Sequence, residues 1–218
     1  MKSSIVLLSG GLDSATALYL ALSEGYQCRC LIFDYGQRHR REIEAAKKIA
    51  RKAKCAYSIV KIALPWGGSS LLDKKLALKP ASGYQGIPNT YVPARNIILL
   101  SFALSYAEAI GAKAIFIGAH AQDYSGYPDC RPEFFRSFGK VITTGTKAGV
   151  GKRSIAVRVP LQNKNKSQII KLGNKLGVPF ELTWSCYKGG GKPCGKCDSC
   201  YYRAKGFKEA GFSDPAKE

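Results

Sequence analysis

Residues 4–23 read SIVLLSGGLDSATALYLALS, an apolar run followed by two glycines and a helical pattern. The run Ser4–Leu8 is short and ends close to the glycines, which is typical of a buried strand. From Asp13 to about Ser23, the side chains of Leu18 and Leu22 fall on one face, as in an amphipathic helix. The chain therefore begins with a strand, a tight turn and a helix, the repeating unit of parallel α/β sheets.

The same alternation of strand and helix continues over about 180 residues. Further strands are predicted at Gln27–Phe33, Tyr57–Ile62, Ala114–Gly118 and Ser154–Val159, and helices at Arg40–Ala53, Ala94–Ala109, Glu133 to about Val141 and Ser167–Leu176. Leu64–Thr90 is rich in Gly, Pro and Ser and is predicted to be a long loop. A short helix is expected near the C-terminus. Such alternation means parallel strands joined by right-handed crossovers. We therefore expect an α/β fold, a parallel five-stranded sheet with helices on both faces.

The composition is that of a globular protein, with 218 residues, 45% of them hydrophobic and 22% charged, and it argues against a disordered chain. No apolar run approaches the roughly 18 residues of a membrane span. The N-terminal stretch resembles a signal peptide, but Gly10, Gly11 and Asp13 interrupt its apolar part. We therefore expect a cytoplasmic protein without a membrane partner. The net charge of +19 favours anionic partners such as phosphates and carboxylates, and it leaves nucleic acid open.

The turn SGGLDS, residues 9–14, lies between the first strand and the first helix. Its glycines allow a tight turn, and the helix N-terminus adds N–H donors and positive potential. With the hydroxyls of Ser9 and Ser14, this pattern predicts a cradle for a phosphate group. It lacks the lysine of G-x-x-x-x-G-K-[ST], so it is not a Walker loop. The alternative is an ordinary strand–turn–helix junction capped by Asp13 or Ser14.

Four of the eight cysteines lie within fifteen residues, at Cys186, Cys194, Cys197 and Cys200. Four thiolates can close a tetrahedral Zn²⁺ site, and a closed site has no open position for a substrate. The C-x2-C-x2-C run also resembles part of an iron–sulfur motif, and this alternative stays open. We expect one structural zinc per chain, which would pin the C-terminal segment beside the active face.

Several polar residues follow predicted strands, where ligands bind in parallel sheets. Asp34 follows the second strand and is either a ribose ligand or the cap of the next helix. Arg95 lies in the first turn of a predicted helix, where a cation is unfavourable unless an anion lies nearby. Lys166 starts another helix within residues 134–180, a run with ten Lys or Arg and no acid. Arg95 is therefore a candidate for binding phosphate or carboxylate, and the alternative is surface packing. Lys166 is a candidate for reaching the ATP phosphates, and the alternative for its charge run is a solvated face.

The segment after the fourth strand combines carboxylates with aromatic rings. Asp123 or Asp129 could accept hydrogen bonds from the edge of a flat base, while Tyr124 or Tyr127 stacks on its face. The alternative is an ordinary turn rich in Asp, Gly and Pro. His39, one of two histidines, is expected to have a modest role in positioning.

Five strings occur in order along the chain: SGGLDS at 9–14, FDYGQRHR at 33–40, GIPNTYVPARN at 86–96, DYSGYPDCR at 123–131 and CY…CGKCDSCYYRAKGF at 186–207. The first string resembles the PP-loop of the ATP pyrophosphatase superfamily. Together the strings closely resemble the 7-cyano-7-deazaguanine synthase (QueC) family, across nearly the whole chain. Ala94 departs from this pattern, because glycine is expected in the family's V-P-G-R-N string, although alanine has a similarly small side chain. The resemblance does not explain the high positive charge.

The resemblance implies an adenine-nucleotide alpha-hydrolase-like fold. It also implies conversion of 7-carboxy-7-deazaguanine, ammonia and ATP to 7-cyano-7-deazaguanine through adenylated intermediates, in queuosine or archaeosine precursor biosynthesis. Mg²⁺ is expected to accompany the ATP, held mainly by phosphate oxygens with Asp13 as a candidate ligand, and the chain is expected to form a homodimer. Two parts follow, a PP-loop ATP-binding α/β domain at 1–183 and, packed on it, a four-cysteine zinc-binding segment at 184–218. The residues expected to bind ATP are Leu8, Ser9, Gly10, Gly11, Leu12, Asp13, Ser14, Ala15, Thr16, Ala17, Leu18 and Asp34. Those expected to bind the substrate are Arg38, His39, Asn89, Asp123, Tyr124, Tyr127 and Asp129, and the expected catalytic residues are Arg95, Lys166 and Asp13.

Two other functions are compatible with the sequence. A PP-loop enzyme that modifies tRNA directly would explain the net charge of +19, because phosphate contacts dominate nucleic-acid affinity. Against it, 218 residues leave no room for a separate RNA-binding domain, and no cysteine pair lies apart from the cluster in a catalytic pattern. The second alternative is a non-catalytic zinc module that binds nucleic acid. The intact SGGLDS turn argues against it, and ATP turnover would exclude it.

Overall fold

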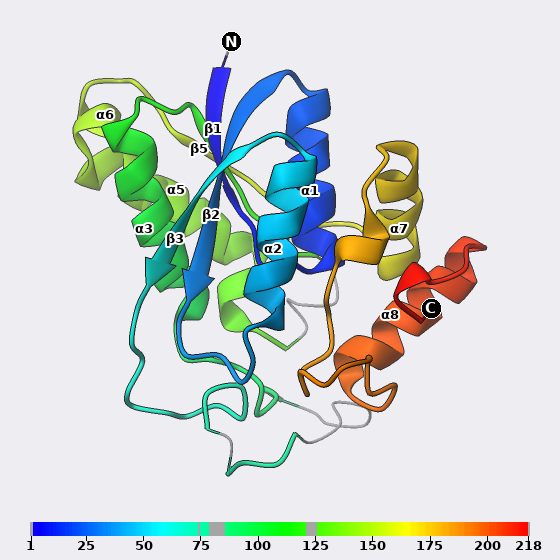
Figure 1. The fold of residues 1–218 in the computed structure, drawn as a ribbon. Helices are drawn as coiled ribbons and strands as arrows, with labels where there is room; N and C mark the ends of the chain where they lie inside the picture. Colours follow the sequence, from blue (N-terminus) through cyan, green and yellow to red (C-terminus); the bar gives the residue numbers. More distant parts are fainter. Residues whose placement is uncertain (1, 74, 79–85, 121–125, 218) are drawn as a thin grey trace.

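Five parallel strands form one sheet in the order β3-β2-β1-β4-β5. The computed structural model describes residues 2–73, 75–78, 86–120 and 126–217 (Figure 1). The strands are β1 (Lys2–Leu7), β2 (Tyr26–Asp34), β3 (Ala56–Lys61), β4 (Ala114–Phe116) and β5 (Ala156–Arg158). After β1 the chain adds strands on one side, and after β3 it crosses to the other. The sheet therefore has a switch point between β1 and β4, where open α/β sheets bind their ligands.

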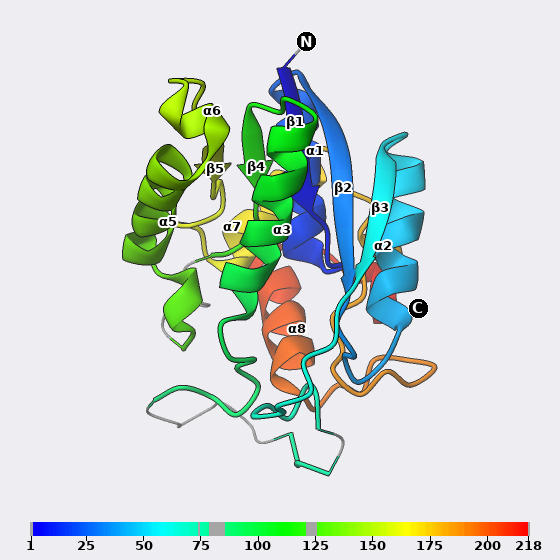
Figure 2. The same ribbon diagram turned by 90° about the vertical axis from the view of Figure 1, so that its left-hand side faces the viewer.

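Helices cover both faces of the sheet, as the sequence predicts (Figure 2). The long helices are α1 (Leu12–Ser23), α2 (Arg41–Lys52), α3 (Arg95–Ala109), α5 (Pro132–Gly145), α7 (Lys166–Lys175) and α8 (Asp198–Ala210). Leu18, Ile49 and Ile169 bring α1, α2 and α7 into one apolar core, and Leu100 and Phe138 bring α3 and α5 into the core on the opposite face. The predicted parallel five-stranded α/β fold is confirmed. Within the described ranges, no helix is long and apolar enough to cross a membrane.

Within the described ranges, the structure adds four short helices that the sequence analysis does not predict. They are α6 (Lys147–Val150) and the 3-10 helices η1 (Pro128–Cys130), η2 (Phe180–Leu182) and η3 (Pro215–Lys217). Helix α6 spans a single turn and starts where the Thr146 hydroxyl accepts a hydrogen bond from the Gly149 N–H at 2.9 Å. A segment this short has too few residues for a hydrophobic period, so only its cap marks it.

The C-terminal helix α8 shares the core of the sheet domain. Phe207 and Ala210 are buried in the same apolar cluster as Ile169 of α7. A methyl group at Gly206 would collide with the side chain of Lys166, so the two helices approach closely there. The two expected parts, 1–183 and 184–218, are therefore packed around a common core, and the division between them stays a prediction.

Ala94, the residue before α3, has φ 54° and ψ 22°, a left-handed conformation. Side chains are disfavoured there because Cβ crowds the backbone, whereas glycine adopts it freely. The glycine expected from the family resemblance would adopt this left-handed conformation without strain. Alanine is almost as small, but its Cβ still crowds the backbone at this φ.

Replacing Ala94 with glycine is expected to stabilise the protein by about 0.5–1 kcal/mol, since it relieves this strain. Chemical denaturation of both proteins measures the change. Ala204→Gly, in the interior of α8, is the control and should destabilise by a similar amount, because its backbone is already helical. An Ala94→Gly protein that is less stable than the wild type would contradict the strain.

Candidate active site

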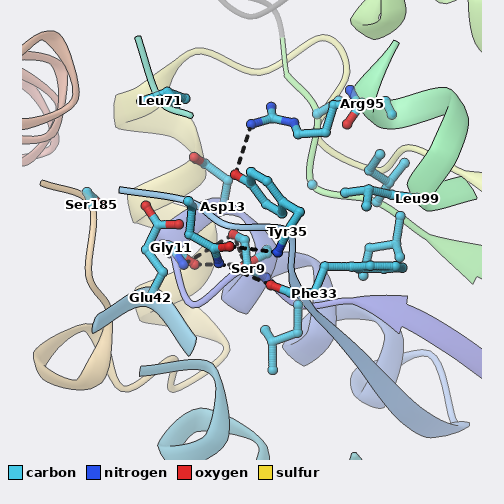
Figure 3. Close-up of a pocket in the computed structure, with 18 of the residues that line it drawn as sticks. Ser9, Gly11, Asp13, Phe33, Tyr35, Glu42, Leu71, Arg95, Leu99 and Ser185 are labelled. Carbon is cyan, nitrogen blue, oxygen red and sulfur yellow. Dashed lines mark hydrogen bonds between the residues drawn. The ribbon is translucent and has the colours of Figure 1, made fainter. Parts of the chain in front are cut away.

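A cavity of about 270 Å³ opens at the carboxyl ends of β1, β2 and β4 (Figure 3). Polar residues from several separate parts of the chain line it, including Thr90 of the long loop and Tyr127 and Cys130 of the segment after β4. The others are Ser9, Gly11, Asp13 and Ser14 from the turn after β1, Tyr35, Gln37 and Glu42 from the loop after β2 and the start of α2, Arg95 and Asn96 from α3, and Trp184, Ser185, Tyr187 and Ser199 from the C-terminal segment. The cavity thus lies at the switch point of the sheet, the place predicted from the strand order.

The turn after β1 is a tight, internally bonded loop. Gly10 has φ 87°, and a methyl group at this position would collide with the carbonyl oxygen of Glu42, so only glycine fits. The hydroxyls of Ser9 and Ser14 lie 3.0 Å apart, and the Gly11 N–H donates to the Ser9 hydroxyl at 3.3 Å. This arrangement exposes hydroxyls and the N-terminus of α1 to the cavity, as a phosphate cradle requires.

Lys166, Asp13 and His120 lie together at the edge of the loop, and the side chains of Lys166 and His120 are buried. The Lys166 ammonium donates to both carboxylate oxygens of Asp13 at 2.8 Å, and it lies 2.9 Å from Nε2 of His120. Burial raises the pKa of Asp13, but the positive charges of Lys166, His120 and Arg203 outweigh it, and the net shift is downward. Asp13 is therefore ionised at neutral pH and holds the Lys166 ammonium beside the cradle.

Arg95 lies across the cavity from this cluster. Its guanidinium donates to the Tyr35 hydroxyl at 3.4 Å (Figure 3). Among the described residues, no carboxylate lies within salt-bridge distance of Arg95. The guanidinium in the cavity is therefore suited to an anionic ligand.

Glu42, in the first turn of α2, also lines the cavity. Burial raises the pKa of Glu42 to about 7, although the positive charge of Arg95 partly opposes the shift.

Four of the residues expected to bind the substrate lie in the segment that follows β4. Tyr127 lines the cavity, bonds the Thr90 hydroxyl at 2.7 Å and stacks on Tyr91. Asp129 is buried and accepts from the Asn96 N–H at 2.9 Å, so one of its oxygens anchors the start of α3. Asp123 and Tyr124 lie outside the described residues.

Other residues from the sequence analysis do not line this cavity. Asn89 donates to the Ala77 carbonyl inside the long loop, and Arg38 donates to the Leu76 carbonyl. The ring of His39 contacts Trp184. Asp34, at the end of β2, is half-buried and is also absent from the cavity lining. Of the expected ATP-binding residues, Leu8, Ser9, Gly11, Asp13 and Ser14 line the cavity, whereas Leu12, Ala15, Thr16, Ala17 and Leu18 are buried on α1.

The sequence analysis missed His120 and Glu42. His120 follows β4, where a polar residue after a strand could have drawn attention. Glu42 lies in the first turn of a strongly charged helix, where an acid is normal and marks nothing unusual. Both become site residues only through contacts with segments far away in the chain.

The four C-terminal cysteines meet in space and could hold a metal ion. The sulfur atoms of Cys186, Cys194, Cys197 and Cys200 all lie within 4.8 Å of one another. Backbone N–H groups of Lys188 and Cys194 each donate to the Cys186 sulfur at 3.4 Å, as they do around metal-bound thiolates. Since Trp184 and Tyr187 flank Cys186, this cluster also shapes one wall of the cavity.

Comparison with known proteins agrees with this geometry. The family model described as "Queuosine biosynthesis protein QueC" matches residues 3–211. This chain belongs to the QueC family. The family resemblance predicted from the five sequence strings is confirmed.

Curated relatives of this family match over the full length. The 7-cyano-7-deazaguanine synthase of Acetivibrio thermocellus is 54% identical over 215 residues, covering 98% of this chain and 96% of that protein. The enzyme of the same name from Pseudomonas syringae pv. tomato is 52% identical over 220 residues, covering 99% and 97%. A solved 4-thiouridine synthetase–RNA complex with bound ATP is 19% identical, with a TM-score of 0.52 over 95% of this chain and 53% of that one. This last similarity shows the fold.

Proposed function

We propose that this chain is an ATP-dependent 7-cyano-7-deazaguanine synthase. It would convert 7-carboxy-7-deazaguanine and ammonia to the nitrile, in queuosine or archaeosine precursor biosynthesis. Full-length identity above 50% to proteins of that name carries the proposal. The cavity supports it, because a phosphate cradle faces Arg95 across a space large enough for reacting groups.

The proposed chemistry activates a carboxylate twice. A carboxylate is a poor electrophile, because ammonia would have to expel oxide. Transfer of AMP to a carboxylate oxygen creates a good leaving group, and attack by ammonia then gives the amide with release of AMP. Transfer of a second AMP to the amide oxygen, followed by its loss, gives the nitrile. Each transfer releases pyrophosphate.

The residues of the cavity have separate roles in this proposal. The Ser9–Ser14 turn holds the phosphates that leave as pyrophosphate, and Lys166 and Arg95 stabilise the charge that develops there. Asp13 keeps Lys166 in place through the two hydrogen bonds described above. Mg²⁺ bound to the ATP would screen the phosphate charges, and phosphate oxygens would be its main ligands. Tyr127 would stack on the deazaguanine ring.

The cysteine cluster would hold one structural Zn²⁺. Four sulfur donors within 4.8 Å suit the tetrahedral geometry of zinc, with Zn–S distances of about 2.3 Å. A closed site of this kind supplies rigidity and takes no part in the reaction. Assembly as a homodimer and a cytoplasmic location remain predictions of the same proposal.

A direct assay tests the function. Purified protein receives 7-carboxy-7-deazaguanine, Mg-ATP and ammonium, and mass spectrometry measures the nitrile and the nucleotide products. We expect nitrile with two AMP and two pyrophosphate for each molecule formed. No nitrile from folded, metal-loaded protein would refute the proposal. ATP cleavage only after addition of tRNA would instead support a tRNA-modifying enzyme, the function that the net charge of +19 favours.

A further inference from the structure

Among the residues that the structure describes, two carboxylates line the cavity, and they differ in their surroundings. Asp13 accepts two hydrogen bonds from Lys166. Glu42 receives no hydrogen bond and forms no ion pair within the described part of the chain. A carboxylate in a reaction cavity that has no partner is free to exchange a proton with a bound molecule.

The packing of α2 against the Ser9–Ser14 turn places Glu42 beside the loop expected to hold the ATP phosphates. Its carbonyl oxygen lies against Gly10, which leaves no room for a side chain there. Its side chain lines the cavity, and Figure 3 shows the carboxylate between the segment that carries Ser185 and the Ser9–Gly11 turn. The carboxylate of Glu42 therefore lies next to the loop expected to hold the ATP phosphates.

The surroundings of the two carboxylates shift their pKa values in opposite directions. Burial raises the pKa of Glu42 to about 7, whereas the nearby positive charges lower the pKa of Asp13. Such a separation distinguishes a group that exchanges protons from one that stays charged. A base is most effective when its pKa lies near the working pH.

The other ionisable groups of the described residues that line the same cavity come from several elements: Asp13 of α1, Tyr35 of the loop after β2, Arg95 of α3, Tyr127 and Cys130 of the segment after β4, and Tyr187 of the C-terminal segment. Burial raises the pKa of Tyr35, so its hydroxyl is already protonated at neutral pH. Asp13 and His120 both contact the Lys166 ammonium. Glu42 is therefore better placed than these three groups to accept a proton from a bound molecule.

We propose that Glu42 is the general base that takes a proton from ammonia as the amide forms. This inference rests on the proposed function. Nitrogen attacks the carbonyl carbon of the adenylated substrate, and a C–N bond forms as the C–O bond to AMP breaks. AMP leaves with the electron pair of that bond. One N–H proton passes to a carboxylate oxygen of Glu42, so the step is balanced and needs no oxidant or reductant.

The test compares the wild type with Glu42→Gln, which keeps the shape and removes the base. The measured quantity is kcat/KM for ammonium between about pH 6 and pH 8.5. We expect a loss of about 100-fold in the variant above pH 7.5. The wild-type advantage should shrink toward pH 6, because the wild-type carboxylate becomes protonated. Pyrophosphate release from ATP and 7-carboxy-7-deazaguanine without ammonia should stay within about threefold of the wild type.

Glu44→Gln is the matched control. Glu44 lies on the same helix, is exposed and pairs with Lys47, so its removal should leave both rates unchanged. An unchanged kcat/KM for ammonium in Glu42→Gln would overturn the inference, and so would an equal loss of pyrophosphate release, which indicates a structural role. Wild-type protein that releases no pyrophosphate with 7-carboxy-7-deazaguanine would refute the proposed function, and the inference with it.

Discussion

Replacing Lys166 with methionine is expected to lower kcat for nitrile formation by about 10²–10³-fold, the usual effect of removing one group that stabilises developing charge. The Lys166 ammonium is buried, is held 2.8 Å from both oxygens of Asp13, and lies next to the phosphate cradle. Methionine has a similar length and no charge, so the variant removes the charge with little change in packing. Pyrophosphate release should fall by the same factor, since both adenylations use the same loop.

The same substitution is expected to lower the free energy of unfolding by about 1–3 kcal/mol, because Asp13 loses its hydrogen-bonded cation. His120, with Nε2 3.7 Å from the Asp13 carboxylate, would be its nearest remaining partner in an ion pair. The folded-state pKa of Asp13 is lowered from 3.8. Its contribution to stability is therefore present above that value and is lost as the pH falls below it. The difference between wild type and variant should stay constant from neutral pH to about pH 5 and shrink below about pH 4.

Lys171→Met is the control for both measurements, because Lys171 is exposed on the same helix. Steady-state kinetics and urea unfolding over a pH series provide the two quantities. A Lys166→Met protein with wild-type kcat would remove Lys166 from the mechanism. A stability difference that grows as the pH falls would contradict the ionised pair with Asp13.

Replacing Cys197 with serine is expected to abolish metal binding and, with it, to lower nitrile formation strongly. Trp184, Ser185, Tyr187 and Ser199 form one wall of the cavity and lie within or beside the cysteine segment. A structural metal supplies much of the folding energy of a segment this small, about 10–16 kcal/mol for zinc in isolated peptides. Loss of one ligand should therefore disorder this wall of the cavity, lower the Tm of the protein and reduce turnover by more than about 100-fold.

Metal analysis, thermal unfolding and the nitrile assay measure these effects. Cys55→Ser is the control, because Cys55 lies just before β3 and outside the cluster. It should keep one zinc per chain and full activity. A Cys197→Ser protein that retains both metal and activity would contradict the structural role. If the wild type shows the absorbance typical of an iron–sulfur cluster, the four cysteines hold iron and the assignment of zinc is wrong.

The fold could be predicted from the sequence because the local hydrophobic patterns match the strands and helices of the structure. The strand expected at Ser4–Leu8 is found at Lys2–Leu7, and the helix expected from Asp13 to Ser23 is found at Leu12–Ser23. The family also followed from the order of five strings. The backbone strain at Ala94 could not be anticipated, since side-chain size conveys nothing about φ.

The site was accessible only in part. The Ser9–Ser14 cradle is local, so its chemistry can be predicted from adjacent residues. The Lys166–Asp13 pair joins residues 153 positions apart, and Arg95, whose charge acts on the pKa of Glu42, lies on a different helix. Such contacts depend on tertiary packing, which no local pattern encodes. His120 was missed for the same reason.

Isotope labelling tests the central claim, that the cradle serves to transfer AMP to an oxygen of the substrate. The carboxylate of 7-carboxy-7-deazaguanine is labelled with ¹⁸O on both oxygens, and the products formed from ATP and ammonium are separated and weighed by mass spectrometry. The account predicts nitrile without oxygen and one ¹⁸O in each of the two AMP molecules. Label in pyrophosphate, inorganic phosphate or water, with unlabelled AMP, would contradict adenylation of the substrate.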